Sequence, residues 1–452
     1  MTANGSVEGA LVKALLLNRG RAWTLGALSV SFGVGVVAAC GSNSDDSGIV
    51  TVNDAGADRE PIIKPPPPHV PVSIAAGGSQ ACAIMDDGRL FCWGANTYGQ
   101  LGNPQITALP DGGSAFDKRP VPFPQLASVG NVRQVAPGGP ENEDGVKVAN
   151  TCAILADAQA QCWGENKHEG LGRRKTTTFD DYNPHPDSLP VMGLGPAQQI
   201  ITNGTTACAL SDGHVWCWGQ GQYWADGGGG GPRPSRLDGE DFPKTKHMAI
   251  GLMHGVEVDE SGYVSGWGNS GYGQLGPNGA RSVIHELYGA VEVAAGGFTT
   301  CARMRTGEVR CLGRNAFGLL GRGPSDDTNS KEAAAVLLPT DKTAATQIVM
   351  SINHACALLV DGSVWCWGKN FWGGLGSGQS NGATVDPPQS GTPLRVEGLP
   401  LPATSIAVGL GFTCALLSDR TVMCWGRNED GNLGQGTLDT APHLTPVRVP
   451  LW

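Results

Sequence analysis

Paired cysteines are the feature that most constrains the fold of this chain. Six times along its 452 residues, two cysteines recur nine or ten positions apart around a turn-like dipeptide. A further copy of the segment, HGVEVDESGYVSGWG, has Val256 and Gly266 in the two cysteine positions. Independent thiols would be lost one at a time, so the joint loss indicates that each pair acts as a unit. The simplest unit is a disulfide within a β-hairpin, which predicts an exported protein built from repeats. The predicted pairs are Cys82 with Cys92, Cys152 with Cys162, Cys208 with Cys217, Cys301 with Cys311, Cys356 with Cys366, and Cys414 with Cys424.

Zinc ligation and free buried thiols are the alternatives for these cysteines. Structural zinc sites usually place two cysteines two to four residues apart, and that spacing does not occur in this sequence. Opposed residues on antiparallel strands have Cα atoms about 4.5 to 5.5 Å apart, which suits a disulfide. Where the turn is one residue shorter, at Asp212-Gly213, the cysteine interval also shortens by one. The spacing therefore follows the hairpin register, and we predict disulfides with no metal or other cofactor.

The cysteine pairs mark a unit that recurs seven times. Each copy begins with a short apolar stretch and a turn, then continues through Cys-Ala-Leu, Asp-Gly, Val-x-Cys-Trp-Gly and Asn-x-x-Gly-x-Leu-Gly or variants of them. Asp-Gly between β-prone residues indicates a tight hairpin. A polar loop and a short segment such as RPVPFPQL then supply a fourth strand. Glycine-rich, four-stranded units predict an all-β fold, a seven-bladed β-propeller of antiparallel blades over residues 71–452.

The C-terminal segment is expected to close the ring. An open solenoid is the alternative, and it would need atypical end units. This chain instead starts at the inner part of a unit and ends on a segment from Pro446 to Pro450 that can complete the first blade. We therefore expect a closed, monomeric propeller joined by its C-terminal strand.

These repeats resemble the regulator of chromosome condensation family of seven-bladed propellers over roughly residues 71–452. The motif departs from the family pattern at Leu312, which replaces the tryptophan, and at Ala158 and Arg420, which replace the glycine of Asp-Gly. The stretch after Trp218 is also altered. Members of this family include a nuclear exchange factor for a small GTPase and secreted inhibitors of β-lactamases. The resemblance thus implies binding of a protein partner, including inhibition of an enzyme.

The first 39 residues have the features of a signal peptide. Lys13, Arg19 and Arg21 precede an uncharged apolar run over residues 24–39, which is short for a membrane span. The run ends in Val-Ala-Ala-Cys40, which resembles the lipobox of bacterial lipoproteins. An ordinary secretory signal with a chance cysteine is the alternative.

A lipobox implies that the chain is cut before Cys40, which becomes the lipid-modified N-terminus. Gly41 follows in place of Asp, and the rules of that family then direct the protein to the outer membrane, facing the periplasm or the exterior. Residues 40–70 have little to bury and end in four prolines, which predicts a flexible tether. We expect membrane contact through the lipid only.

Charge argues against nucleic acid as the partner. Without residues 1–39 the chain has 28 basic and 40 acidic residues, a net charge near −12. Nucleic acids select basic surfaces. The partner is therefore expected to be a protein, which the sequence does not identify.

Aromatic residues at the starts of loops are the candidate binding residues. Tyr98, Tyr182, Phe317 and Trp372 can anchor a partner on a rigid ring, although packing is the simpler explanation for each of them. The repeated tryptophans of Trp-Gly are expected to pack between blades. His254 and His354 share one repeat position, and no Ser-His-Asp order stands out, so structure explains the histidines better than catalysis does.

The sequence predicts a lipid-anchored propeller that acts as a binding or scaffold module on the cell envelope, and no enzyme. One alternative is a hydrolase or lyase with its site at the central channel, where carboxylates or histidines with shifted pKa values would converge. A purely mechanical envelope component and an inhibitor of a secreted or periplasmic enzyme are the others.

Overall fold

The computed structural model describes residues 69–103, 121–139, 149–173, 181–220, 231–237, 243–323, 326, 328–339, 344–379 and 389–451. All of them belong to the unit Pro65–Trp452. The predicted signal peptide, Cys40 and nearly all of the predicted tether lie outside the described residues. Among the residues that are described, no helix has the length and apolar character needed to cross a bilayer.

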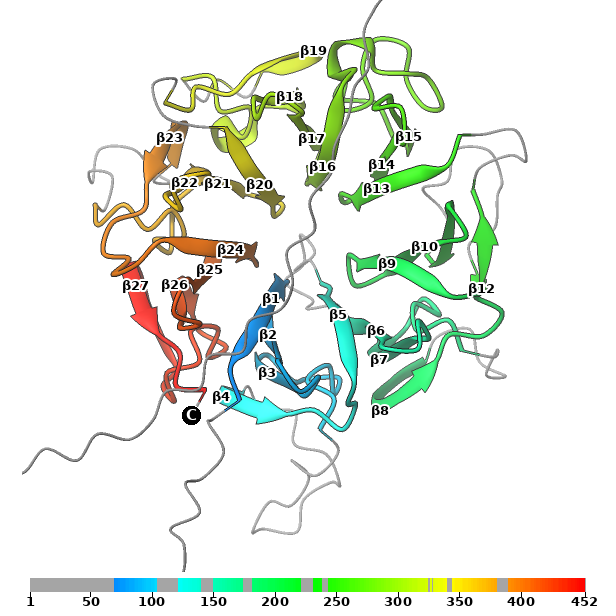
Figure 1. Cartoon of the computed structure of the whole chain (residues 1–452), viewed down its shortest axis with the longest axis vertical. Helices are drawn as coiled ribbons and strands as arrows, with labels where there is room; N and C mark the ends of the chain where they lie inside the picture. Colours follow the sequence, from blue (N-terminus) through cyan, green and yellow to red (C-terminus); the bar gives the residue numbers. More distant parts are fainter. Residues whose placement is uncertain are drawn as a thin grey trace, which may run out of the picture. The chain divides into compact units, whose positions relative to one another are not determined.

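Seven antiparallel sheets surround a central axis as the blades of a propeller (Figure 1). The first strand of each blade lies nearest the axis, and the others follow outward in sequence order. Blade 1 contains β1 (Pro71–Gly77), β2 (Gln80–Met85), β3 (Leu90–Gly94) and β4 (Val121–Leu126), and blade 2 contains β5 (Val132–Pro137), β6 (Asn150–Leu155), β7 (Ala160–Asn166) and β8 (Asp181–Pro190). Blade 3 contains β9 (Ala197–Thr202), β10 (Thr206–Ser211), β11 (His214–Gly219) and β12 (Gly231–Arg236).

The remaining blades follow the same order. Blade 4 contains β13 (Thr245–Ile250), β14 (His254–Asp259) and β15 (Val264–Gly268), and blade 5 contains β16 (Ala290–Gly296), β17 (Thr299–Met304), β18 (Val309–Arg314) and β19 (Asn329–Ala335). Blade 6 contains β20 (Ala345–Met350), β21 (His354–Leu359), β22 (Val364–Lys369) and β23 (Gln389–Arg395), and blade 7 contains β24 (Ala403–Val408), β25 (Phe412–Leu417), β26 (Val422–Asn428) and β27 (Asp439–Arg448). The predicted seven-bladed, all-β fold is confirmed.

Blade 4 departs from the four-stranded pattern. After β15 the chain forms a single turn of 3-10 helix, η1 (His285–Leu287), where the other blades have an outer strand. Two backbone hydrogen bonds still cover the edge of β15, from Arg281 N to Gly266 O and from Ile284 N to Val264 O. A short loop thus replaces the fourth strand.

The C-terminal strand does not complete the first blade, so that prediction was wrong. β27 pairs with β26 of its own blade, where Val447 lies opposite Cys424. The outer edge of blade 1 is already filled by β4, where Leu126 lies opposite Phe91. Each blade is therefore continuous in sequence, and the ring closes through packing between blades 1 and 7, where Trp93 joins one apolar cluster with buried side chains of blade 7.

The predicted hairpin register is confirmed for every cysteine pair. In each of the six blades concerned, the first cysteine lies directly opposite the second on the neighbouring strand. All six pairs form disulfides, with Cα atoms 4.1 Å apart, closer than the spacing expected for opposed strand residues. The bridges join Cys82 to Cys92, Cys152 to Cys162, Cys208 to Cys217, Cys301 to Cys311, Cys356 to Cys366, and Cys414 to Cys424.

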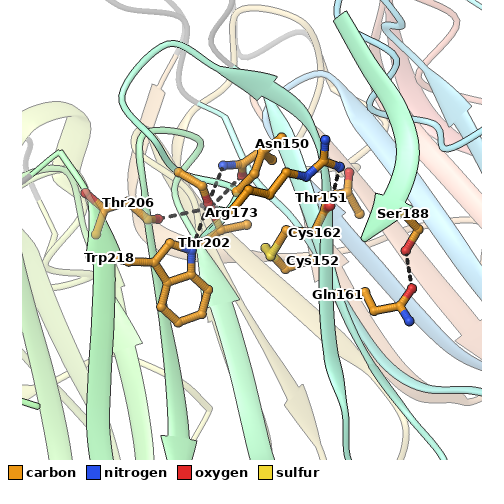
Figure 2. Close-up of a disulfide and its surroundings, with 12 residues drawn as sticks. Asn150, Thr151, Cys152, Gln161, Cys162, Arg173, Ser188, Thr202, Thr206 and Trp218 are labelled. Atoms are coloured by element: carbon orange, nitrogen blue, oxygen red, sulfur yellow. Dashed lines mark hydrogen bonds between the residues drawn. A yellow bond between two sulfur atoms is a disulfide. The ribbon is translucent and has the colours of Figure 1, made fainter. Parts of the chain in front are cut away.

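The bridges lie inside the fold and take no part in a binding surface. Every bridged cysteine is buried, with at most 1% of its surface exposed. Figure 2 shows the bridge of blade 2, which lies in one apolar cluster with Trp218 of blade 3. In blade 3, Cys217 belongs to a small apolar cluster that also contains Trp267 of blade 4. In blade 6, Cys366 packs in one cluster with Trp425 of blade 7. The disulfides therefore reinforce both the hairpins and the packing between blades.

Blade 4 has little room for a side chain at one of its two cysteine positions, Gly266. Val256 and Gly266 lie opposite each other in the cysteine positions. A Cβ atom on Gly266 would lie 2.6 Å from the carbonyl oxygen of Gly255, and a Cβ on Gly255 would lie 2.2 Å from the ring of Trp267. The tryptophan of this blade occupies the space that a side chain at 255 would need, and a side chain at 266 would require the strands to move.

The other Trp-Gly tryptophans join neighbouring blades, as predicted. Each buried indole N–H donates at 2.9 Å to a backbone carbonyl oxygen in the Asn-x-x-Gly-x-Leu-Gly loop of the preceding blade. The accepting residue directly precedes the leucine of that motif in every case, so one loop geometry recurs around the ring. The accepting oxygens belong to Asn432 for Trp93, Gln100 for Trp163, Gly170 for Trp218, Leu319 for Trp367 and Gly374 for Trp425.

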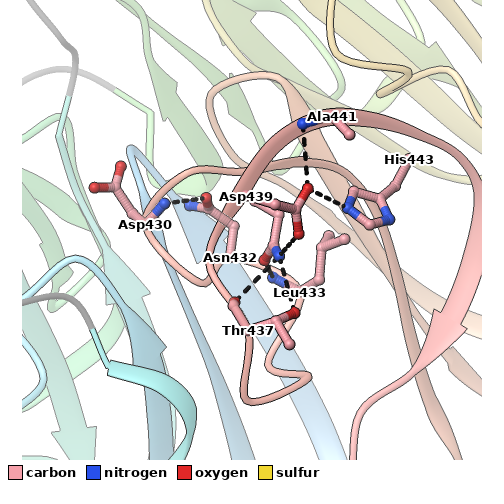
Figure 3. Close-up of polar contacts among 8 residues, drawn as sticks. Asp430, Asn432, Leu433, Thr437, Asp439, Ala441 and His443 are labelled. Carbon is pink, nitrogen blue, oxygen red and sulfur yellow. Dashed lines mark hydrogen bonds and ion pairs between the residues drawn. The ribbon is translucent and has the colours of Figure 1, made fainter.

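The asparagine of that loop fixes its shape. In blade 7 the Asn428 Oδ1 atom accepts from the backbone N–H of Leu433, and the Asn428 amide donates to Asp439 at 2.7 Å. Asp439 also contacts His443 at 2.9 Å (Figure 3). These hydrogen bonds hold the loop of the motif in a fixed shape between two blades.

Candidate binding surface

The central channel is lined by the inner strands, which border an open cavity of about 320 Å³. Its polar side chains occupy one repeat position and reach to the backbone of the next blade. Gln134 binds the N–H and C=O of Ile200. Gln199 binds those of Met248 in the same way, and Gln347 binds those of Ile406. These amides therefore tie the inner strands together.

His247 and Glu292 occupy the same repeat position in blades 4 and 5. The His247 Nδ1 atom lies 3.4 Å from the backbone N of Val293, and Glu292 pairs with Arg303 at 2.6 Å. Burial, with Arg303 and Lys246 nearby, lowers the pKa of His247 to about 4. Burial also raises the pKa of Glu292, although its pairing with Arg303 opposes that shift. Their shared position with the glutamines assigns both to the joining of blades.

One face of the propeller collects cations and aromatic rings in alternation. The third strands of all blades point the same way relative to the propeller axis, so their C-terminal ends lie on this face. In three successive blade pairs, the aromatic side chain directly before Gly-x-Leu-Gly lies against the cation that follows Trp-Gly, or Leu-Gly, in the next blade. We name this set the cation–aromatic arc. It contains Tyr272, Arg314, Phe317, Lys369, Phe371, Trp372 and Arg427.

Lys369 lies at the centre of the arc. Its Nζ atom is 5.1 Å from the ring centre of Phe317, 6.0 Å from that of Phe371 and 5.4 Å from that of Trp372. Cations within about 6 Å of a ring face are attracted by its quadrupole. The side chain is half-buried, and burial lowers its pKa.

Trp372 is held between blades 6 and 7. The guanidinium of Arg427 lies 5.1 Å from its ring centre, and a Cβ atom added to Gly411 would lie 2.5 Å from the ring. Arg427 is buried and is itself paired with Glu429 at 2.6 Å. Phe371 packs edge-on against Trp372 and leaves half of its surface, 50%, exposed. The arc therefore has a fixed base and an accessible aromatic rim.

Phe317 reaches Lys369 through an unusual backbone. Its φ is 59°, in the left-handed region, whereas none of the corresponding residues in the described loops of other blades has a positive φ. A non-glycine residue in this region costs on the order of 1 kcal/mol or more, and such strain clusters at functional sites. The loop tolerates it next to Gly318, which also has a positive φ.

Of the four predicted aromatic anchors, two lie in the arc and two do not. Phe317 and Trp372 meet around Lys369, and Tyr98 holds the same loop position in blade 1. Tyr182 is the second residue of β8, but its side chain lies outside the described part of the chain. The position in blade 2 that corresponds to the arc's cations is held by Glu165, and burial raises the pKa of its carboxyl to about 7. Tyr98 therefore has no cation at this position of the next blade, and the arc does not extend to it.

The cations were missed by sequence reasoning, although a signal was present. Arg314, Lys369 and Arg427 directly follow Leu-Gly or Trp-Gly in three successive copies, where blades 1 and 2 have Ala95 and Glu165. Only the packing of one blade on the next shows that this position faces the loop aromatic of its neighbour.

One group of metal-ligating side chains exists within the described ranges, at His69, Asp86 and Asp87. All three are exposed, and Asp87 already pairs with the guanidinium of Arg89 at 2.5 Å. A fixed cation beside the carboxylate opposes binding of a second one, so the group does not support a metal site.

Comparison with known proteins agrees with this architecture. The family described as "Regulator of chromosome condensation (RCC1) repeat" matches residues 72–100, 290–319 and 403–432 in one form and residues 87–139 and 361–416 in another. The Ultraviolet-B receptor UVR8 of Arabidopsis thaliana is 26% identical over 329 residues, 69% of this chain and 68% of the receptor. The human E3 ubiquitin-protein ligase HERC2 is 29% identical over 214 residues. The match covers 46% of this chain but only 4% of HERC2.

Solved structures show the same fold. Yeast RCC1 (Prp20), crystallised with Kap60, has a TM-score of 0.67 at 20% identity, with 84% of this chain and 85% of that chain covered. Human WBSCR16 has a TM-score of 0.66 at 22% identity, with 80% and 95% covered. Repeat matches in the first, fifth, sixth and seventh blades agree with these propellers. The chain therefore contains regulator of chromosome condensation (RCC1) repeats, matched within residues 72–139, 290–319 and 361–432.

Proposed function

We propose that this chain is a lipid-anchored protein of the bacterial cell envelope whose propeller binds a protein partner through the cation–aromatic arc. The observation that carries the proposal is the arc itself, where Lys369 and Arg427 alternate with Phe317 and Trp372 on one face. Arginine and the aromatic residues are enriched at the energetic centres of protein interfaces. The arc rests on rigid inter-blade loops, which lowers the entropic cost of binding.

Relatives support a binding role. Yeast RCC1 (Prp20) was crystallised bound to Kap60, and the structure of Prp20p of Saccharomyces cerevisiae was described with its binding properties to Gsp1p and histones. These partners are those of the named proteins, and at 20% identity or less the likeness shows the fold alone. The polar side chains of the channel are used in joining blades, which supports a binder over a hydrolase or lyase.

Six disulfides support the proposed location. Disulfides persist in oxidising compartments and are rare in the cytosol. The lipobox-like Val-Ala-Ala-Cys40 supplies the anchor in this proposal. Replacing Cys40 by Ala should release the protein from washed membranes into the soluble fraction. Unchanged membrane association of the Cys40→Ala chain would refute the anchor and leave the binding proposal standing.

The binding proposal is tested by site-specific photocrosslinking in intact cells. A photoreactive phenylalanine analogue replaces Phe371 on the arc, and in a matched control it replaces Val360, which is 65% exposed at the β21–β22 turn on the opposite face. We expect a discrete protein adduct from position 371 and none from position 360. Equal adducts at both positions, or none at 371, would refute the arc as the binding surface.

A further inference from the structure

The arc contains one cation, Lys369, that pairs with no acidic side chain in the described part of an acidic protein. The whole chain has 41 acidic and 31 basic residues. Arg427 is satisfied by Glu429 at 2.6 Å, whereas no carboxylate among the described residues pairs with the Lys369 ammonium. That ammonium is instead held by three rings.

The surroundings of Lys369 fix where a new ligand can approach. The ammonium lies within 6.0 Å of the ring centres of Phe317, Phe371 and Trp372, so these rings flank it. Rings attract a cation but accept no strong hydrogen bond, so within the described ranges the N–H donors of the ammonium remain available for oxygen atoms. Burial makes an ion pair stronger than in water, because screening by solvent is reduced.

We propose that Lys369 receives an aspartate or glutamate side chain from an acidic segment of the partner protein, with Phe371 and Trp372 packing against the apolar atoms beside that carboxylate. This inference rests on the proposed function and names the chemistry of the partner. Charge complementarity selects the occupant, because Lys369 pairs with no carboxylate among the described residues, whereas Arg427 is already paired with Glu429.

The charge at position 369 should therefore control binding. Glutamate in place of Lys369 puts two carboxylates against each other in a partly dry site, which costs more than losing the pair. Arginine keeps the charge and the stacking on aromatic rings, so it should retain binding. Glutamine removes the charge and should give an intermediate loss.

The test combines two crosslinkers on the full chain in envelope membranes. A water-soluble carbodiimide joins an amine to a carboxylate only when the two groups are in contact. We expect it to link Lys369 to an aspartate or glutamate of the protein that the photoreactive analogue at position 371 captures. The Lys369→Arg chain should lose the carbodiimide link and keep the photoadduct, and Lys369→Glu should lower the photoadduct at least tenfold.

The matched control is Lys244→Glu, because Lys244 is exposed at the start of blade 4 and lies away from the arc. We expect its photoadduct within twofold of the unaltered chain. A protein photoadduct at 371 that survives Lys369→Glu, or that forms with no Lys369 carbodiimide link, overturns the acidic partner and leaves the proposed function intact. Absence of any photoadduct at 371 overturns both. A lipid adduct at 371 in place of a protein adduct would assign the cation to anionic lipid and would also overturn both.

Discussion

The indole N–H of Trp425 in blade 7 donates to the carbonyl oxygen of Gly374 in blade 6 at 2.9 Å. Gly374 lies two residues after Trp372, in the same loop that carries part of the arc. The side chain that joins two blades thus also fixes the loop that presents the arc. Stability of the ring and geometry of the binding surface are therefore coupled at this position.

Replacing Trp425 by Phe removes that hydrogen bond and part of the buried volume. Trp425 is fully buried, so we expect a loss of roughly 2 to 4 kcal/mol in the free energy of unfolding. Denaturant titration followed by fluorescence measures it. Trp365→Phe is the control, because that half-buried ring donates only to Ser363 of its own hairpin. A loss from Trp365→Phe as large as that from Trp425→Phe would argue against a special role for the inter-blade bond.

Ala158 and Arg420 adopt the backbone that glycine has in the other hairpin turns. Their φ values are 67° and 70°, against 80° for Gly88 and 78° for Gly362. Left-handed backbone costs an L-residue about 1 to 2 kcal/mol, and the added freedom of glycine in the unfolded chain offsets part of this. We expect Ala158→Gly and Arg420→Gly each to stabilise the fold by about 0.5 to 1 kcal/mol, measured by thermal unfolding.

The control for these turns is Ala334→Gly, in the extended strand β19, where glycine should destabilise by a similar amount. Equal destabilisation by glycine at positions 158, 420 and 334 would show that the turns carry no strain.

Blade 4 should not accept a seventh disulfide. The Cβ clash at Gly266 predicts that Val256→Cys with Gly266→Cys leaves the fold no more stable, and we expect a net loss. In contrast, removing the bridge between Cys301 and Cys311 by alanine at both positions should cost roughly 2 to 3 kcal/mol. Thiol titration and thermal unfolding distinguish the outcomes. A formed bridge at 256–266 with a gain of that size would contradict the explanation given for this blade.

Much of this fold could be predicted because a hairpin is local. The cysteine interval follows the register of two adjacent strands, and Asp212-Gly213 shortens the turn and the interval between Cys208 and Cys217 together. Ring closure is a long-range choice, and the sequence near Pro446 has no mark that distinguishes blade 7 from blade 1. Lys369 was missed for the same reason, because its neighbour Phe317 belongs to another blade, 52 positions away in the sequence.

Acid should weaken the contact between blades 6 and 7. His354 is fully buried, with Nε2 2.9 Å from Thr413 Oγ1, and burial lowers its pKa to about 4 from 6.5. The unfolded chain binds this proton more readily than the folded chain does. Protonation of His354 therefore leaves the free energy of unfolding unchanged above pH 6.5 and lowers it as the pH falls from 6.5 toward 4. Over that pH range His354 accounts for a loss of up to roughly 3 kcal/mol in the free energy of unfolding.

Glutamine supplies the matched variant for His354. Gln80 holds the same repeat position in blade 1 and donates to Thr151 Oγ1 at 2.9 Å. His354→Gln should therefore fold at neutral pH and show a smaller fall in unfolding midpoint than the unaltered chain as the pH is lowered from 6.5 toward 4. An identical pH dependence in the two chains would remove His354 as the cause.

The binding role of the arc is tested most directly by the dissociation constant of the partner captured through position 371. Trp372→Ala removes a ring that contacts both Lys369 and Arg427, and Val360→Ala changes an exposed side chain on the opposite face. Titration of the purified partner should show affinity at least tenfold weaker for Trp372→Ala and within twofold of the unaltered chain for Val360→Ala. Equal affinities for all three chains would contradict binding through the cation–aromatic arc.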